Sequence, residues 1–215
     1  MPARPTRPTR PTKRDAAATK EKILRAGLIE FGTRGFGGAR TETIAKRAKC
    51  NIRMLYHYFE SKEGLYLACL ERVYTEIRTS ERELDLLDCS PVEGITKLVE
   101  FTFDHMLSHQ DFVRIVVVEN MQRSRFLKKL APLPSAASDL VATIREILDR
   151  GSREGRFRTG IDAVQLYVSI LSLSYLHLSN RYTLSFTYET DLAAREWIVQ
   201  RRVHVTEMVL SYLSV

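Results

Sequence analysis

Cysteine is scarce in this chain, and its few cysteines form no pattern. Cys50, Cys69 and Cys89 are odd in number and lack the close spacing of a metal-binding or redox pair. A disulfide framework is therefore not expected, and a reducing cytoplasm is the predicted location. A thiol sensor is the alternative role for such residues, whereas packing as small apolar side chains is the default.

A segment suited to a membrane is also lacking. The N-terminus has no apolar core of the kind that a signal peptide carries. The charge-free stretch 163–180 holds 7 polar side chains among its 18 residues, whereas a membrane-spanning helix is predominantly apolar. We expect a helix buried between other helices, and no membrane partner.

The motifs of catalysis are missing as well. The sequence shows no nucleophile with an ordered base, no phosphate-binding loop and no metal triad. His105 and His109 lie four residues apart with Asp104 beside them, but no third ligand is placed, so ordinary surface or core histidines are expected. We predict neither an enzyme nor a metal site nor a cofactor.

Positive charge, by contrast, is abundant and uneven. Within a net charge of +7, residues 1–62 carry 15 lysines and arginines against 5 acidic residues, and the remainder carries 18 against 21. A basic head on a mildly acidic body predicts that the head meets a polyanion. Arg-Pro-Thr repeats within residues 1–18 predict a disordered basic arm. Contact with DNA and a solvated leader without a specific role both remain open for this arm.

Apolar periodicity predicts an all-α fold of about nine helices, and no run shows sustained strand alternation. Only residues 115–118, all β-branched, are locally ambiguous. Capping signals at Asn51, Ser90 and Asp162 mark three helix starts. The expected helices span 19–35, 41–48, 52–59 and about 61–87, begin near 91 and 111, and then span 135–154, 163–180 and 191–213.

Two short helices joined by a tight link, 41–48 and 52–59, form a candidate helix-turn-helix. In the second helix Leu55 and Phe59 face the core, which leaves the opposite side for a DNA major groove. Arg53 is the natural reader of guanine there. The predicted DNA-binding residues are Ile52, Arg53, Met54, Tyr56 and His57 toward the bases or sugars, and Thr41, Thr43, Asn51, Tyr58 and Lys62 toward the phosphates.

Residues 22–70 resemble the TetR family of transcriptional regulators. The resemblance is carried by the segment Thr41-Glu42-Thr43-Ile44-Ala45, one residue shorter than the family pattern, and by Leu55-Tyr56-His57-Tyr58-Phe59-Glu60-Ser61-Lys62-Glu63-Gly64-Leu65. The usual turn glycine is Lys49 here, and Asn51-Ile52-Arg53-Met54 replaces the frequent Ser-Lys-Gly-Thr entry to the recognition helix. Operator sequences of relatives therefore do not transfer. Segments 119–120 and 178–185 are similar to a subgroup with repressors of nicotinate and pyrimidine catabolism.

The resemblance implies a homodimeric repressor that a small-molecule effector releases from a near-palindromic operator. Residues 19–62 would form the DNA-binding domain and residues 63–215 the effector-binding and dimerisation domain, linked by the helix 61–87. Helices 163–180 and 191–213 would pack against their mates. The long hydrophobic second domain disfavours the alternative of a ligand-free architectural DNA binder. The candidate effector-pocket residues are Phe101, His105, Asn120, Tyr167, Tyr175 and Asn180, with core or dimer packing as the alternative for the tyrosines.

Overall fold

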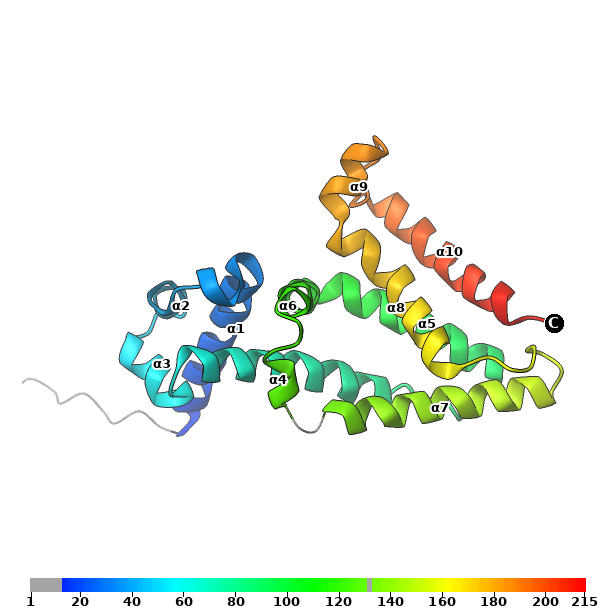
Figure 1. The fold of residues 1–215 in the computed structure, drawn as a ribbon, viewed down its shortest axis with the longest axis horizontal. Helices are drawn as coiled ribbons and strands as arrows, with labels where there is room; N and C mark the ends of the chain where they lie inside the picture. The colour runs from blue at the N-terminus through cyan, green and yellow to red at the C-terminus, as the bar shows by residue number, and fades with distance from the viewer. Residues whose placement is uncertain (1–12, 131–132) are drawn as a thin grey trace, which may run out of the picture. The chain divides into compact units, whose positions relative to one another are not determined.

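The computed structural model describes residues 13–130 and 133–215, and these residues divide into two compact units that meet between Cys69 and Leu70. Within the described ranges the chain is helical, with only an isolated bridge between Phe157 and Ser214, so the all-α prediction is confirmed. In chain order the helices are α1 (Lys13–Gly38), α2 (Thr41–Arg47), α3 (Ile52–Phe59), α4 (Lys62–Arg82), α5 (Pro91–Ser108), α6 (Gln110–Met121), α7 (Leu133–Arg153), α8 (Ala163–Ser179), α9 (Arg181–Thr187) and α10 (Arg195–Leu213), with a 3₁₀ turn at Leu127–Lys129 (Figure 1).

The first unit is a three-helix domain closed by the start of α4. Helices α1, α2 and α3 contact one another. Ile23, Ile44, Leu55 and Leu65 are fully buried between them. Phe31 meets the buried ring of Tyr66 edge to face, with 4.9 Å between ring centroids. This aromatic contact fixes the start of α4 against α1, because such pairs add stability beyond the area that they bury.

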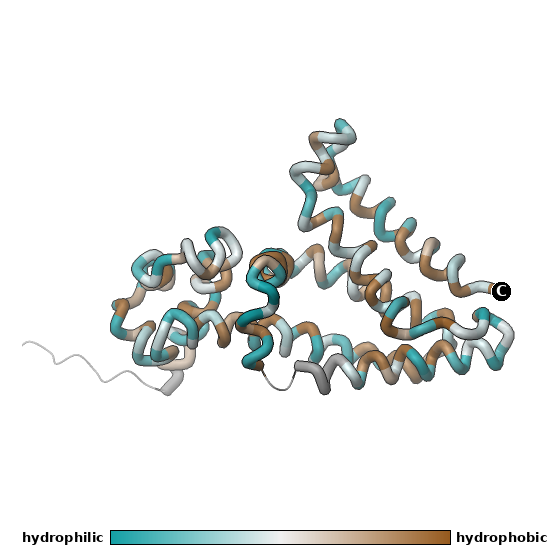
Figure 2. The backbone as a smooth tube through the Cα atoms, in the orientation of Figure 1, coloured by the Kyte–Doolittle hydropathy of each residue, from teal (hydrophilic) through white to brown (hydrophobic). Residues whose placement is uncertain are grey.

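The second unit is built around α5. This helix packs against α6, α7, α8 and α10, and its apolar side chains are fully or almost fully buried. Apolar residues recur along α7, α8 and α10 at helical spacing (Figure 2). No helix in the described part of the chain is long and apolar enough to cross a membrane.

Several helix boundaries differ from the predictions. Helix α1 begins at Lys13, so residues 13–18 of the predicted arm are helical, while residues 1–12 lie outside the described ranges. The predicted end at Gly35 is a kink, with φ 65°. Helix α4 ends at Arg82 rather than near residue 87, because a turn follows in which Asp85 takes φ 47°. Helix α9 was not predicted, and the β-branched residues 115–118 are helical within α6.

Candidate nucleic-acid interface and small-molecule cavity

The link between α2 and α3 holds the two helices in a tight turn. Lys49 has a left-handed backbone conformation, with φ 55°. The amide of Cys50 donates a hydrogen bond to the carbonyl of Ala45 at 3.1 Å. A lysine in place of glycine at this conformation costs about 1 kcal/mol. The side chain of Asn51 then caps α3 by accepting a hydrogen bond from the amide of Arg53 at 2.9 Å.

Helix α3 has one buried side and one exposed side, as predicted from its sequence. Leu55 is fully buried and Phe59 is almost so. Arg53, Tyr56 and His57 are exposed, whereas Ile52, Met54 and Tyr58 are half-buried. The exposed side therefore combines a guanidinium, a phenol and an imidazole, which are hydrogen-bonding groups suited to base edges and phosphates.

Two residues predicted to contact phosphate also have contacts within the domain, and a third is half-buried. Thr41 is buried, and its hydroxyl shares a hydrogen bond with the phenol of Tyr56 at 3.1 Å, so it positions the Tyr56 side chain. Lys62 is half-buried, with Nζ donating to the carbonyl of Gly37 at 3.5 Å and lying 5.0 Å from the ring of Phe36. Thr43 is half-buried as well.

The structure adds exposed basic residues around α2 that the sequence prediction did not include. They are Arg40, Lys46, Arg47 and Lys49. The excess of positive charge in residues 1–62 was a signal for them, but charge alone does not say which basic side chains share a surface with α3. Because Ile44, Ala45 and Ala48 are buried, helix periodicity places Lys46 and Arg47 on the exposed side of α2.

A cavity of about 250 Å³ lies in the second unit, between α4, α5, α6 and α8. Its walls are mainly apolar and aromatic. It is lined by Tyr74, Ile77, Arg78, Met106, Phe112, Val116, Asn120, Tyr167, Val168, Leu171, Ser172 and Tyr175. Three of the predicted pocket residues, Asn120, Tyr167 and Tyr175, are among them. Such a cavity suits a small, mostly apolar molecule.

A hydrogen-bonded network of α4 and α8 forms one wall of this cavity. Arg78 Nη1 donates to Glu81 Oε2 at 2.5 Å, and the Tyr167 hydroxyl donates to Glu81 Oε1 at 2.6 Å. Burial raises the pKa of Glu81 and of Tyr167 above their ordinary values. Because Glu81 and Tyr167 are buried and Arg78 is half-buried, the network ties the end of α4 firmly to α8.

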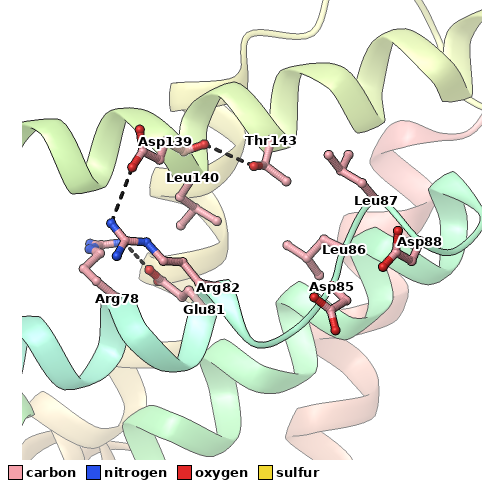
Figure 3. A pocket seen from close by; sticks show the side chains of 10 residues that line it. All are labelled: Arg78, Glu81, Arg82, Asp85, Leu86, Leu87, Asp88, Asp139, Leu140 and Thr143. Atoms are coloured by element: carbon pink, nitrogen blue, oxygen red, sulfur yellow. Dashed lines mark hydrogen bonds and ion pairs between the residues drawn. The ribbon is translucent and has the colours of Figure 1, made fainter.

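The same network borders a second cavity of about 330 Å³, shown in Figure 3. Arg78 and Glu81 line it together with residues of the turn after α4 and of α7. Arg82 reaches across it to Asp139 of α7, with 3.4 Å between Nη2 and Oδ2 (Figure 3). The side chain of Arg78 therefore lines both cavities, whereas Glu81 lines the second one.

The other three predicted pocket residues do not line the cavity. Phe101 is half-buried, with its ring centroid 5.5 Å from that of His105. His105 is buried and stacks on His109 at 4.0 Å. Burial lowers the pKa of His105 to about 4. Asn180 is exposed and bonds to the end of α8. In the described part of the chain no three potential ligands gather as a metal site.

Two families of known proteins match the two units. The family described as bacterial regulatory proteins of the tetR family matches residues 23–69. The family described as the tetracyclin repressor-like C-terminal domain matches residues 91–209. The chain is 36% identical over 181 residues to the transcriptional repressor NicS of Pseudomonas putida, covering 84% of this chain and 85% of that protein.

A second relative and a solved structure extend the similarity. The transcriptional repressor SCO4008 of Streptomyces coelicolor is 30% identical over 64% of this chain and 69% of its own length. The crystal structure of the transcriptional regulator SCO4942 from the same organism superposes with a TM-score of 0.69 at 24% identity, over 91% of this chain and 98% of that one. The latter similarity supports the fold alone.

Proposed function

Because this chain belongs to the TetR family of DNA-binding transcriptional regulators, we propose that it represses transcription by placing α3 in the major groove of an operator. The observation that carries the proposal is the exposed side of α3, where Arg53, Tyr56 and His57 project from a helix capped at Asn51. A major groove admits an α-helix, and its base edges are distinguishable. We place its action in the bacterial cytoplasm, where the DNA lies. Its proposed role is regulation and not catalysis.

Two copies of the chain would bind a near-palindromic operator. Each copy supplies one α3, and two-fold symmetry would set the two helices in successive major grooves. The contact between copies is assigned to α8 and α10. Residues 63–215 serve as the effector-binding and dimerisation domain, and residues 19–62 as the DNA-binding domain. Sedimentation as a monomer at micromolar concentration would contradict this assembly.

Arg53→Ala is expected to weaken binding to the operator by about 1–3 kcal/mol and to relax base preference at one position in each half-site. The reason is the loss of a bidentate donor to guanine. Binding to fragments of the upstream region, with scrambled competitor at physiological salt, measures the effect. Arg145→Ala removes one charge from an exposed site on α7 and serves as the matched control. Equal losses for the two variants would show that Arg53 contributes only charge.

A small-molecule effector would bind in the cavity between α4, α5, α6 and α8. We propose a mostly apolar molecule with hydrogen-bond acceptors, because Arg78 and Asn120 line the cavity together with aromatic side chains. The ligand would change the position of α4 through Arg78, Glu81 and Tyr167. By linkage, a compound that stabilises the protein through this cavity weakens operator binding, and operator weakens the compound by the same factor. Thermal-shift screening followed by titration with and without operator tests this. Equal affinity in both titrations would exclude the mechanism.

A further inference from the structure

One turn of α8 carries two buried polar side chains that make no hydrogen bond within the described part of the chain. Ser174 and His177 are 0% and 3% exposed, and neither the Ser174 hydroxyl nor the ring nitrogens of His177 have a partner. Other serines of α8 behave differently, since Ser169 and Ser172 each donate to the carbonyl four residues earlier, at 2.9 and 2.7 Å. Leaving a buried polar group unsatisfied is costly, so a partner for these atoms is expected.

A guanidinium of α10 lies beside this turn. Arg201 Nη2 donates to the carbonyl of Leu173 at 3.3 Å, whereas the buried Nε of the same side chain has no acceptor. Arg201 is also close enough to His177 to lower the pKa of that ring. The Leu173 carbonyl acts on His177 in the opposite direction, but it already accepts from Arg201. Three side chains with unused N–H or O–H groups are therefore neighbours between α8 and α10.

The charge of Arg201 has no carboxylate to balance it among the residues whose positions are described. The neighbouring Arg202 shows the usual arrangement. Its guanidinium pairs with Asp104 and Glu100 of α5, each at 2.9 Å, and these carboxylates raise its pKa. The pKa of Arg201 is lowered instead, and burial is the cause. Because buried charges in proteins are normally paired, Arg201 calls for a negative partner.

Aromatic rings border this group of donors. The ring of Phe103 on α5 stacks on His177, with 5.1 Å between centroids, and the ring of Trp197 on α10 lies 5.4 Å from it. Such surroundings hold little water, and charges attract each other more strongly there than in solution. A positive charge and several donors without a negative group are the properties of a site for an anion.

We propose that Arg201, Ser174 and His177 bind a small monovalent anion between α8 and α10. The Arg201 Nε–H and the Ser174 hydroxyl donate to it, and the neutral His177 ring adds one N–H. Chloride and formate share the required chemistry, since both combine one negative charge with few atoms. The bound anion ties α8 to α10 within one chain. This binding goes beyond the proposed repression of transcription, because it needs neither operator nor effector.

The single tryptophan reports on this site, because Trp197 packs against His177. Its fluorescence is recorded for the full-length protein at pH 7 while chloride or formate replaces gluconate at constant ionic strength. We expect a change that saturates, and the anion that saturates at the lower concentration is the better occupant. Arg201→Gln should weaken binding about tenfold or more, because a charge-assisted hydrogen bond is lost. Arg195→Gln, exposed on the same helix, is the matched control and should bind like the parent.

Ser174→Ala provides a second test if Arg201→Gln does not fold. Urea unfolding of this variant is followed by Trp197 fluorescence in chloride and in gluconate. Loss of a ligand for the anion should reduce the gain in stability that chloride gives to the parent. Removal of a hydroxyl that binds nothing should instead shift the unfolding midpoint equally in both salts, and that result would overturn the proposal.

A crystal grown in bromide locates the anion directly. An anomalous peak beside Arg201 Nε and Ser174 Oγ is expected. An ordered water at this position, with no saturable fluorescence response to chloride or formate, would refute the anion site. A saturable response with unchanged affinity in Arg201→Gln would also refute it, because the anion would then bind elsewhere. Operator binding is measured in a separate experiment, so neither result would decide the proposed function.

Discussion

Acidification from pH 6.5 to pH 4 is expected to destabilise the second unit by several kcal/mol. His105 and His177 are 5% and 3% exposed, and the pKa of each is lowered from 6.5 to about 4. Burial is the main cause for both. The nearby His109 lowers the pKa of His105 further, and Arg201 lowers the pKa of His177 further. Rings surround His177, with Phe103 at 5.1 Å and Trp197 at 5.4 Å between centroids.

The sign follows from proton binding. Between pH 6.5 and pH 4 the unfolded chain protonates both histidines while the folded chain keeps them neutral, so stability falls as pH falls through this window. Each histidine accounts for about 3 kcal/mol at the end of the window. Glu81 acts in the opposite direction, because burial raises its pKa and its protonation favours the folded chain.

Urea unfolding at pH 7, 6, 5 and 4, followed by circular dichroism, measures the dependence. His177→Phe should remove about half of the loss attributed to the two histidines, since an aromatic ring is kept between Phe103 and Trp197 without a titratable group. His204→Gln, at an exposed position of α10, is the matched substitution of a histidine outside the core. A His177→Phe protein with the pH dependence of the parent would show that this ring is already protonated in the folded state at pH 5.

Local signals in the sequence predicted much of the fold because capping is a local interaction. Ser90 and Glu93 form the predicted capping box, and Asp162 accepts the amide of Gln165 at 2.8 Å. Helix α9 was missed because its first residue has no side-chain cap and its seven residues bury none of their side chains. A helix that packs little leaves no apolar periodicity to detect.

The two candidate sites also differ in how much of each could be predicted from local sequence signals. The exposed side of α3 follows from the period of one helix, so Arg53 and His57 were placed on it from sequence. The cavity depends on which helices face one another, and the contributions of Tyr74, Ile77 and Arg78 from α4 were not predicted. Arg78, a charged residue on the apolar side of α4, was a usable signal for the cavity. An arginine placed there needs a partner such as Glu81.

Gly64→Ala is expected to destabilise the DNA-binding domain by about 3 kcal/mol and to abolish specific operator binding. A Cβ atom at this position would lie 2.1 Å from the carbonyl oxygen of Phe59, the last residue of α3. That oxygen cannot move freely, because it accepts the amide of Ser61 at 2.6 Å in the turn where Glu60 takes φ 63°. The amide of Gly64 in turn donates to Ser61 Oγ at 2.9 Å. Relief of the clash must open this turn, which sets the direction of α3.

The single tryptophan allows the effect to be assigned to one unit. Trp197 lies in α10, so its fluorescence follows the second unit, whereas circular dichroism follows the helices of both. During unfolding of the Gly64→Ala protein, part of the circular dichroism signal should be lost before the main transition. The transition followed by Trp197 fluorescence should keep its midpoint. Gly37→Ala is the control, because its Cβ would meet nothing within 4 Å and its backbone angle is not left-handed; it should be neutral or stabilising by about 0.5–1 kcal/mol. An early transition in both variants would mean that the clash with Phe59 is not the specific cause of the loss, and an early transition in neither would mean that the turn at Glu60 adjusts without loss of α3.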